Sequence, residues 1–247
     1  MDKFHGKKYP FLIGHRGSAR KAPENTLASF LRAKQDGFSW VEFDVTLARG
    51  GTPVVFHDET LERTTDGNGR LEDQAIESLK KLSAGSWFSD NYSHERIPKL
   101  DEALMLIGQL GMGFNMELKP VDGRERETAE AAIFLAQAAW NEKADLPLIS
   151  SFSRLAILSA YEIAPNWPRS LLFEKVEDDW KEIGKSLNLH SFGMDDACVT
   201  REIIQKIKSE GYGVMVYTVN ELERAKLLRG WGVDSIFTDS PTLLQAI

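Results

Sequence analysis

The sequence predicts an α/β protein, a (β/α)8 TIM barrel with a small insertion after the second strand. Short apolar runs, rich in β-branched and aromatic residues, alternate with amphipathic helical patterns eight times along the chain. The 247 residues suit one barrel domain, 1–247. A doubly wound open sheet is the competing architecture, but it would usually carry a glycine-rich fingerprint. This chain has neither G-x-G-x-x-G nor a P-loop.

The eight predicted strands are the apolar runs of five to eight residues that turn-forming segments separate. They cover residues 11–15, 40–47, 113–119, 146–152, 169–174, 190–195, 213–219 and 234–239. A helix is expected after each strand, and the clearest helical patterns cover residues 23–37, 100–108, 127–140, 200–211 and 221–232. Strand followed by helix, repeated in this way, is the unit of the barrel.

The first helix shows its boundaries in the sequence. Asn25 or Thr26 can cap its start, and Gly37 can end it. Three apolar residues at helical spacing should form its buried stripe: Leu27, Phe30 and Leu31.

Residues 58–98 interrupt the alternation and predict an insertion after strand 2 that forms part of the active-site mouth. The segment is too short to bury a stable core alone, so a second independent domain is not expected. It does contain enough apolar residues for a small cluster, namely Leu71, Ile76, Leu79, Leu82, Trp87 and Phe88.

Composition limits the classes of function. A formal net charge of −7 argues against nucleic acid or an acidic membrane as the main partner. The single cysteine, Cys198, excludes an internal disulfide and a thiolate zinc site, and a buried or half-buried packing role is expected for it. No signal peptide or apolar stretch of membrane-spanning length is visible, which favours a cytoplasmic protein without membrane insertion.

Charged residues inside predicted strands are the strongest functional signal. Side chains alternate along a strand, so Glu42 and Asp44 share one face of "VEFDV", and Glu117 and Lys119 share one face of "NMELK". The apolar faces must pack on the helices, so these charges should point into the barrel. Three carboxylates gathered there indicate Mg²⁺ or Ca²⁺. A buried ion-pair network with Lys119, Arg16 and the histidines is the alternative.

Two histidines, His15 and His57, end apolar runs close to these carboxylates. Histidine titrates near neutrality and can give or take a proton during a reaction. Arg16 adds a guanidinium suited to a phosphate. A hard cation, a guanidinium and two proton carriers fit phosphoryl chemistry.

The motifs "HRGSARKAPENTLASF", "VEFDVTLARGGTPVVFHDETLERTTDG", "MELKP", "VYTVN" and "WGVDSIFTDSP" together resemble the glycerophosphodiester phosphodiesterase family, in its bacterial cytosolic form. The resemblance covers nearly the whole chain. It implies a barrel with a small insertion after strand 2. It also implies hydrolysis of glycerophosphodiesters to sn-glycerol 3-phosphate and an alcohol with the help of a divalent metal.

The resemblance also implies roles for single residues. It gives acid–base catalysis to His15 and His57, and phosphate or substrate binding to Arg16 and Lys119. Tyr217 stands where many family members have tryptophan, and Phe152 either lines the mouth or packs in the core. The metal carboxylates would be Glu42, Asp44 and Glu117.

The sequence therefore predicts a metal-dependent enzyme acting on a small glycerophosphodiester such as glycerophosphocholine or glycerophosphoethanolamine. A phospholipase-type phosphodiesterase acting on lipids is one alternative, and a noncatalytic phosphate-binding barrel is another. The sequence leaves open the native metal, the preferred alcohol and the oligomeric state. It also does not choose between water and the glycerol 2-hydroxyl as the attacking group, or decide which histidine is the acid.

Overall fold

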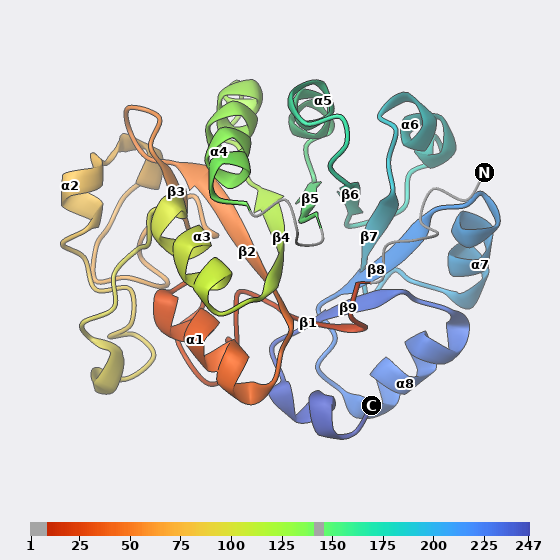
Figure 1. Cartoon of the computed structure of the whole chain (residues 1–247), viewed down its shortest axis with the longest axis horizontal. Coiled ribbons are helices and arrows are strands. Elements are labelled where there is room, and N and C mark those ends of the chain that lie inside the picture. The colour runs from red at the N-terminus through yellow and green to blue at the C-terminus, as the bar shows by residue number, and fades with distance from the viewer. Residues whose placement is uncertain (1–8, 141–145) are drawn as a thin grey trace.

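The computed structural model describes residues 9–140 and 146–247. Within them, eight parallel strands close a barrel surrounded by helices, which confirms the predicted fold class (Figure 1). Closure depends on β1, which pairs in parallel with both β2 and β9. The barrel strands are β1 (Leu12–Gly14), β2 (Trp40–Leu47), β4 (Gly113–Leu118), β5 (Leu148–Ser151), β6 (Arg169–Phe173), β7 (Ser191–Asp195), β8 (Gly213–Tyr217) and β9 (Ser235–Thr238).

Each predicted strand contains one of these eight β-strands. The helices pack on the outside of the barrel. They are α1 (Leu27–Asp36), α3 (Leu100–Gln109), α4 (Glu125–Ala139), α5 (Arg154–Ile163), α6 (Trp180–Ser186), α7 (Arg201–Ser209) and α8 (Leu222–Trp231). The expectation of a helix after every strand is wrong at β9, where the 3-10 helix η3 (Pro241–Gln245) follows instead. The element is built on i→i+3 turns, in which the Leu243 amide donates to the Ser240 carbonyl and the Ala246 amide to the Leu243 carbonyl.

Helix α1 begins and ends close to the predicted boundaries. Thr26 is the N-cap, because its hydroxyl accepts from the Ser29 amide, and Gly37 closes the helix in the left-handed conformation. The predicted buried stripe is wrong for Leu31, whose side chain is 44% exposed, whereas Phe30 is fully buried. The buried face continues through Ala33, three residues after Phe30 and therefore on the same side of the helix.

The main hydrophobic core lies between the barrel and the helices. The apolar residues of β2 alternate as expected, since Val41, Phe43 and Val45 all belong to this core. Phe43 lies against Phe30 of α1 and Phe114 of β4, with ring centroids 5.7 and 5.5 Å away. The polar residues between them therefore face the barrel interior.

Residues after β2 form a small layer beside the barrel (Figure 1). It contains β3 (Pro53–Val55), antiparallel to β2, then η1 (Leu71–Asp73), α2 (Ile76–Leu79) and η2 (Asp90–Tyr92). Its separate apolar cluster includes the predicted Leu71 and Leu79, with Ile76 and Leu82 at its edge. Trp87 was expected there but is 40% exposed; it instead packs edge-on against the neighbouring aromatic ring of Phe88.

Cys198 lies after β7 and is exposed, so the expected buried packing role is wrong. It belongs to a polar turn, where its amide donates to the carbonyl of Asp195. Among the described residues, no helix is long and apolar enough to cross a membrane.

Candidate active site

Three carboxylates meet on the inner face of β2 and β4, two from the middle of β2 and one near the end of β4. Parallel pairing sets Glu42 opposite Asn115 and Asp44 opposite Glu117, so the register brings the predicted acidic residues together. Glu42, Asp44 and Glu117 each offer an oxygen, and these oxygens lie within 4.8 Å of one another. Glu42 is only 3% exposed and Asp44 1%, so the three charges are held in a region of low dielectric.

The protein's own cations compensate this charge only in part. Burial, then repulsion from Asp44 and Glu117, raises the pKa of Glu42 well above its usual range. Burial and repulsion from Asp44 raise the pKa of Glu117 to about 7. Burial would also raise the pKa of Asp44, but Arg16, with its Nε 3.4 Å from Asp44 Oδ2, holds it below the ordinary value.

A divalent cation fits this arrangement. The buried oxygen Glu42 Oε1 has no hydrogen-bond partner among the described residues, and the nearest ammonium, Lys119 Nζ, is 3.5 Å from Glu117 Oε1. Carboxylate oxygens only, without thiolate, are a donor set for Mg²⁺ or Ca²⁺. The ion-pair network left open by the sequence is present around Asp44, but it does not reach Glu42 Oε1.

His15 follows β1 directly, and its ring is held by a residue that follows β9, the strand paired with β1 where the barrel closes. Its Nδ1 lies 2.7 Å from Asp239 Oδ1 at the end of β9, and Asn220 donates to the other Asp239 oxygen at 2.8 Å. Burial raises the pKa of Asp239, but the bond to His15 and the neighbouring donors lower it overall. The ionised carboxylate accepts Nδ1–H, which leaves His15 Nε2 facing the carboxylates, 4.0 Å from Glu42 Oε2.

His57 follows β3 and has its own carboxylate partner. Its Nδ1 lies 2.5 Å from Asp58 Oδ1, and Arg63 donates to both oxygens of Asp58. Burial lowers the pKa of His57, and Arg16 and Lys119 lower it further against the attraction of Asp44. Both histidines are thus held at Nδ1, with Nε2 left for chemistry.

Arg16 is positioned by a sharp turn after β1. It adopts the left-handed conformation with φ 51°, and Gly17 follows with φ 90°. A Cβ on Gly17 would lie 2.4 Å from Ser29 Oγ, so only glycine fits. The Arg16 amide donates to Glu42 Oε2 at 2.9 Å, and its guanidinium donates to Glu24 at 2.7 Å.

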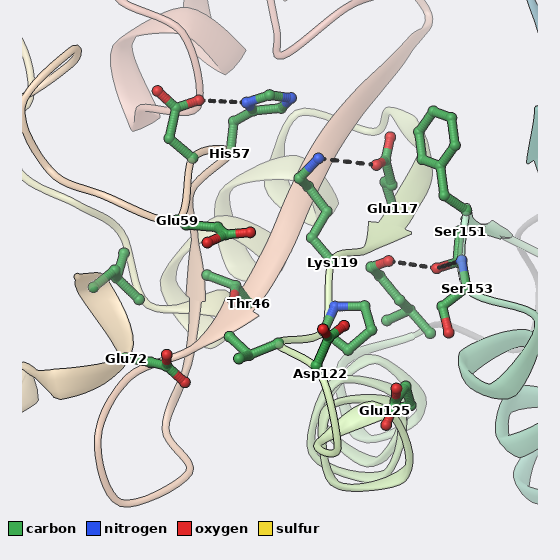
Figure 2. A pocket seen from close by; sticks show the side chains of 16 residues that line it. Thr46, His57, Glu59, Glu72, Glu117, Lys119, Asp122, Glu125, Ser151 and Ser153 are labelled. Carbon is green, nitrogen blue, oxygen red and sulfur yellow. Dashed lines mark hydrogen bonds and ion pairs between the residues drawn. The ribbon is translucent and has the colours of Figure 1, made fainter. Parts of the chain in front are cut away.

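Two cavities open beside the carboxylates. The central cavity, about 110 Å³, lies on the barrel axis and is lined by residues that include His15, Arg16, Glu42 and Tyr217. The lateral cavity, about 460 Å³, lies between the insertion, β4 and the end of β5 (Figure 2). The residues that line both are His57, Glu117 and Phe152.

The two aromatic candidates lie at the cavity walls. Phe152 is 41% exposed, so the core-packing alternative for it is wrong. Its ring meets that of Tyr217 edge-on, with centroids 5.7 Å apart. The Tyr217 hydroxyl donates to the Phe173 carbonyl, so this ring presents a face rather than a free hydroxyl.

The sequence reasoning missed the residues that hold the site together. Asp58 was visible beside His57 in "FHD", but Asp239 is 224 residues away from its partner His15. Asn25, proposed as a helix cap, instead donates to Asp44 Oδ2 at 2.8 Å. Glu24 bridges Arg16 and Arg63 and so connects the turn after β1 with the insertion. Asp239 is suggested only by its place at the end of the strand that closes the barrel onto β1.

A barrel whose polar site lies at the carboxyl ends of its strands defines an enzyme of the TIM-barrel class. Residues 15–243 match the sequence profile of the glycerophosphoryl diester phosphodiesterase family. The chain belongs to this family, as its motifs predicted, and it is a hydrolase of phosphoric diesters.

Relatives and solved structures agree over nearly the full length. A glycerophosphodiester phosphodiesterase of Caldanaerobacter subterraneus subsp. tengcongensis is 33% identical over 240 residues, which cover 94% of this chain and 95% of the relative. A glycerophosphodiester phosphodiesterase of Bacillus subtilis is 29% identical over 251 residues, which cover 95% of this chain and 85% of the relative. An Oleispira antarctica phosphodiesterase, solved with its product sn-glycerol 3-phosphate, superposes with a TM-score of 0.93 and 39% identity, covering 96% of both chains.

Proposed function

We propose that the protein hydrolyses small glycerophosphodiesters, such as glycerophosphocholine and glycerophosphoethanolamine, to sn-glycerol 3-phosphate and an alcohol. The observation that carries the proposal is the arrangement of His15 and His57 on two sides of a buried cluster of three carboxylates, each ring held by a carboxylate at Nδ1. The Oleispira relative supports the product, because its structure contains sn-glycerol 3-phosphate.

Glu42, Asp44 and Glu117 would hold Mg²⁺ or Ca²⁺. When bound, such an ion polarises a phosphoryl oxygen and offsets charge as the diester reacts. The carboxylates must be ionised to act as ligands, and the raised pKa values of Glu42 and Glu117 show how unfavourable that is for the chain alone. The support for the ion is therefore electrostatic as well as geometric.

Arg16 and Lys119 supply positive charge from the protein to the anionic diester. Arg16 is fixed by Glu24 and by Asp44, so its guanidinium is oriented before substrate arrives. Lys119 reaches the cluster from the end of β4 and lines the lateral cavity with Glu117. Phe152 and Tyr217 would bind the apolar parts of the substrate.

The two histidines would move the protons. One Nε2 takes a proton from the attacking oxygen, which forms the new bond to phosphorus. The other histidine, protonated at Nε2, gives its proton to the alcohol oxygen as its bond to phosphorus breaks. The attacker is water, or the glycerol 2-hydroxyl through a cyclic phosphate that water then opens.

The insertion 58–98 would form part of the mouth. Four of its residues, Asp58, Glu59, Leu71 and Glu72, line the lateral cavity. A wall at this place favours deacylated substrates, which have no fatty chain to accommodate. The small-molecule substrate is the proposed partner, and location in the cytoplasm stays a prediction of the sequence.

The proposal is tested by measuring sn-glycerol 3-phosphate released from glycerophosphocholine by the native protein and by Glu42→Gln. Release by the native protein and loss of most of it in a folded Glu42→Gln variant are expected. A native protein that binds sn-glycerol 3-phosphate but releases none from any glycerophosphodiester would support a noncatalytic phosphate-binding barrel instead.

A further inference from the structure

The wall of the lateral cavity is acidic beyond what the reaction needs. Besides the residues of the catalytic centre, four carboxylates line it: Glu59, Glu72, Asp122 and Glu125. The first two come from the insertion, Asp122 from the segment between β4 and α4, and Glu125 from the first turn of α4, so they approach the cavity from both sides (Figure 2).

This charge is only partly compensated. Glu59 and Glu72 share the guanidinium of Arg70, which lies 3.2 Å from Glu59 Oε2 and 2.7 Å from Glu72 Oε1. Within residues 9–140 and 146–247, neither Asp122 nor Glu125 takes part in an ion pair. Lys119 also lines the cavity, but it lies at the inner end, beside Glu117. The outer part of the cavity therefore carries a net negative charge.

The four carboxylates are not arranged like a second metal site. In the described part of the chain, the one group of three acidic, histidine or cysteine residues with ligand atoms within 4.8 Å of one another is Glu42, Asp44 and Glu117. A dispersed ring of carboxylates suits a bulky organic cation, whose charge is spread over several atoms and which needs no close coordination.

The interior of the cavity also points to an organic ligand with a polar atom. Thr46, on the same face of β2 as Asp44, lines the cavity and is 6% exposed. Its hydroxyl makes no hydrogen bond to another described residue, and its oxygen is not fully buried, so it is accessible to a ligand in the cavity. Leu71, Leu118 and the ring of Phe152 give the same cavity apolar surface. An aromatic face and apolar walls suit the methyl groups of an alkylammonium ion.

The lateral cavity joins the catalytic centre at one place. His57 and Glu117 line it and also line the central cavity, whereas His15 and Arg16 line the central cavity alone. A diester whose phosphate lies at this junction extends one alcohol into the central cavity, of about 110 Å³, and the other into the lateral cavity, of about 460 Å³. Glycerol, common to all substrates, fits the smaller space, and the variable alcohol has the larger one.

We propose that the lateral cavity binds the leaving alcohol and that Glu59, Glu72, Asp122 and Glu125 select alcohols that carry an ammonium group over neutral ones. This rests on the proposed glycerophosphodiester activity and adds its substrate class. The Thr46 hydroxyl would form a hydrogen bond, as donor or acceptor, with the leaving alcohol of the substrate. The chemistry that fits is a short aminoalcohol, with a quaternary or primary ammonium at one end.

The test compares kcat/KM for glycerophosphocholine with kcat/KM for glycerophosphoglycerol, whose leaving alcohol is neutral. The variant is Asp122→Asn with Glu125→Gln, and the matched control is Glu127→Gln. Glu127 also lies in the first turn of α4 but pairs with Arg124 and does not line the cavity. At separations of about 8 Å in a wet cavity, each carboxylate should change the preference roughly threefold.

The native protein should prefer the choline diester, and the double variant should lose about tenfold of that preference without a fall in its rate on glycerophosphoglycerol. Choline should inhibit hydrolysis of glycerophosphoglycerol by the native protein and do so more weakly in the double variant, which measures binding of the alcohol itself without hydrolysis of its diester. Equal loss on both substrates, or a native protein without preference, would overturn the inference while leaving the diesterase activity in place. Release of sn-glycerol 3-phosphate from neither diester would instead overturn the proposed function.

Discussion

Changing Glu117 to glutamine should stabilise the metal-free protein at pH 8 while it removes activity. In the folded chain, burial and then Asp44 raise the pKa of Glu117 from the ordinary 4.5 to about 7. Below pH 4.5 the group is protonated in both folded and unfolded chains, so it has no effect on stability. Between 4.5 and 7 the unfolded chain releases its proton first, and stability falls as pH rises. Above 7 the full penalty is present, about 3 kcal/mol.

Glutamine never ionises, so Glu117→Gln avoids this penalty and keeps the shape of the side chain. The variant should gain up to about 3 kcal/mol over the native protein at pH 8, and close to nothing at pH 4.5. For a chain of this size that corresponds to roughly 6–12 °C in Tm at pH 8. Lys119 then lacks its partner, but its side chain is 25% exposed and can be hydrated.

The measurement is thermal unfolding in chelator at pH 5 and pH 8, with Glu182→Gln as control because Glu182 lies on the outer helix α6. Saturating Mg²⁺ should reverse the order, since the ion stabilises only the chain that has all three carboxylates. If Glu117→Gln melted at the native temperature at both pH values in chelator, the three carboxylates would not repel one another as the structure implies.

Three further predictions concern catalysis and stability. Of His15→Ala and His57→Ala, the variant that lacks the general acid should hydrolyse glycerophosphocholine roughly 10²–10⁴-fold more slowly than the native protein, with a much smaller loss of rate on a nitrophenyl phosphodiester. Equal losses of rate on both substrates in both variants would contradict the division of roles. If residues 58–98 restrict the mouth, lysophospholipid should have a far lower kcat/KM than glycerophosphocholine, and comparable values would count against a restrictive wall. Arg169 is buried and donates to the carbonyls of Ala164, Trp167 and Asn188. Arg169→Met should therefore lower the free energy of unfolding by about 2–4 kcal/mol, as measured by urea titration. An unchanged midpoint of urea unfolding would contradict this and would show that water replaces these bonds.

Much of the fold could be predicted because the pattern of the sequence is local. Each barrel strand is a short apolar run, and the alternation of Glu42 and Asp44 with Val41, Phe43 and Val45 fixes which side chains face inward. Parallel pairing of β2 with β4 then brings Glu117 beside Asp44, which the sequence anticipated from the parity of "NMELK".

What could not be predicted depends on contacts that are distant in sequence. Asp239 meets His15 only because β9 closes the barrel onto β1. Leu31 fits a helical stripe by spacing, but the direction in which α1 packs is set by Phe30 and Ala33. Trp87 and Cys198 are apolar by type, yet both are exposed, since hydrophobic residues lie on surfaces wherever no neighbouring element covers them.

The most direct test of the account is the dependence of glycerophosphocholine hydrolysis on a divalent cation. The native protein, dialysed against chelator until metal-free, should release almost no sn-glycerol 3-phosphate, and Mg²⁺ or Ca²⁺ should restore the release. Glu42→Gln, still folded by circular dichroism, should not recover at the same metal concentration. Full turnover after exhaustive chelation would contradict the assignment of Glu42, Asp44 and Glu117 as ligands and would favour an ion-pair network at the centre of this barrel.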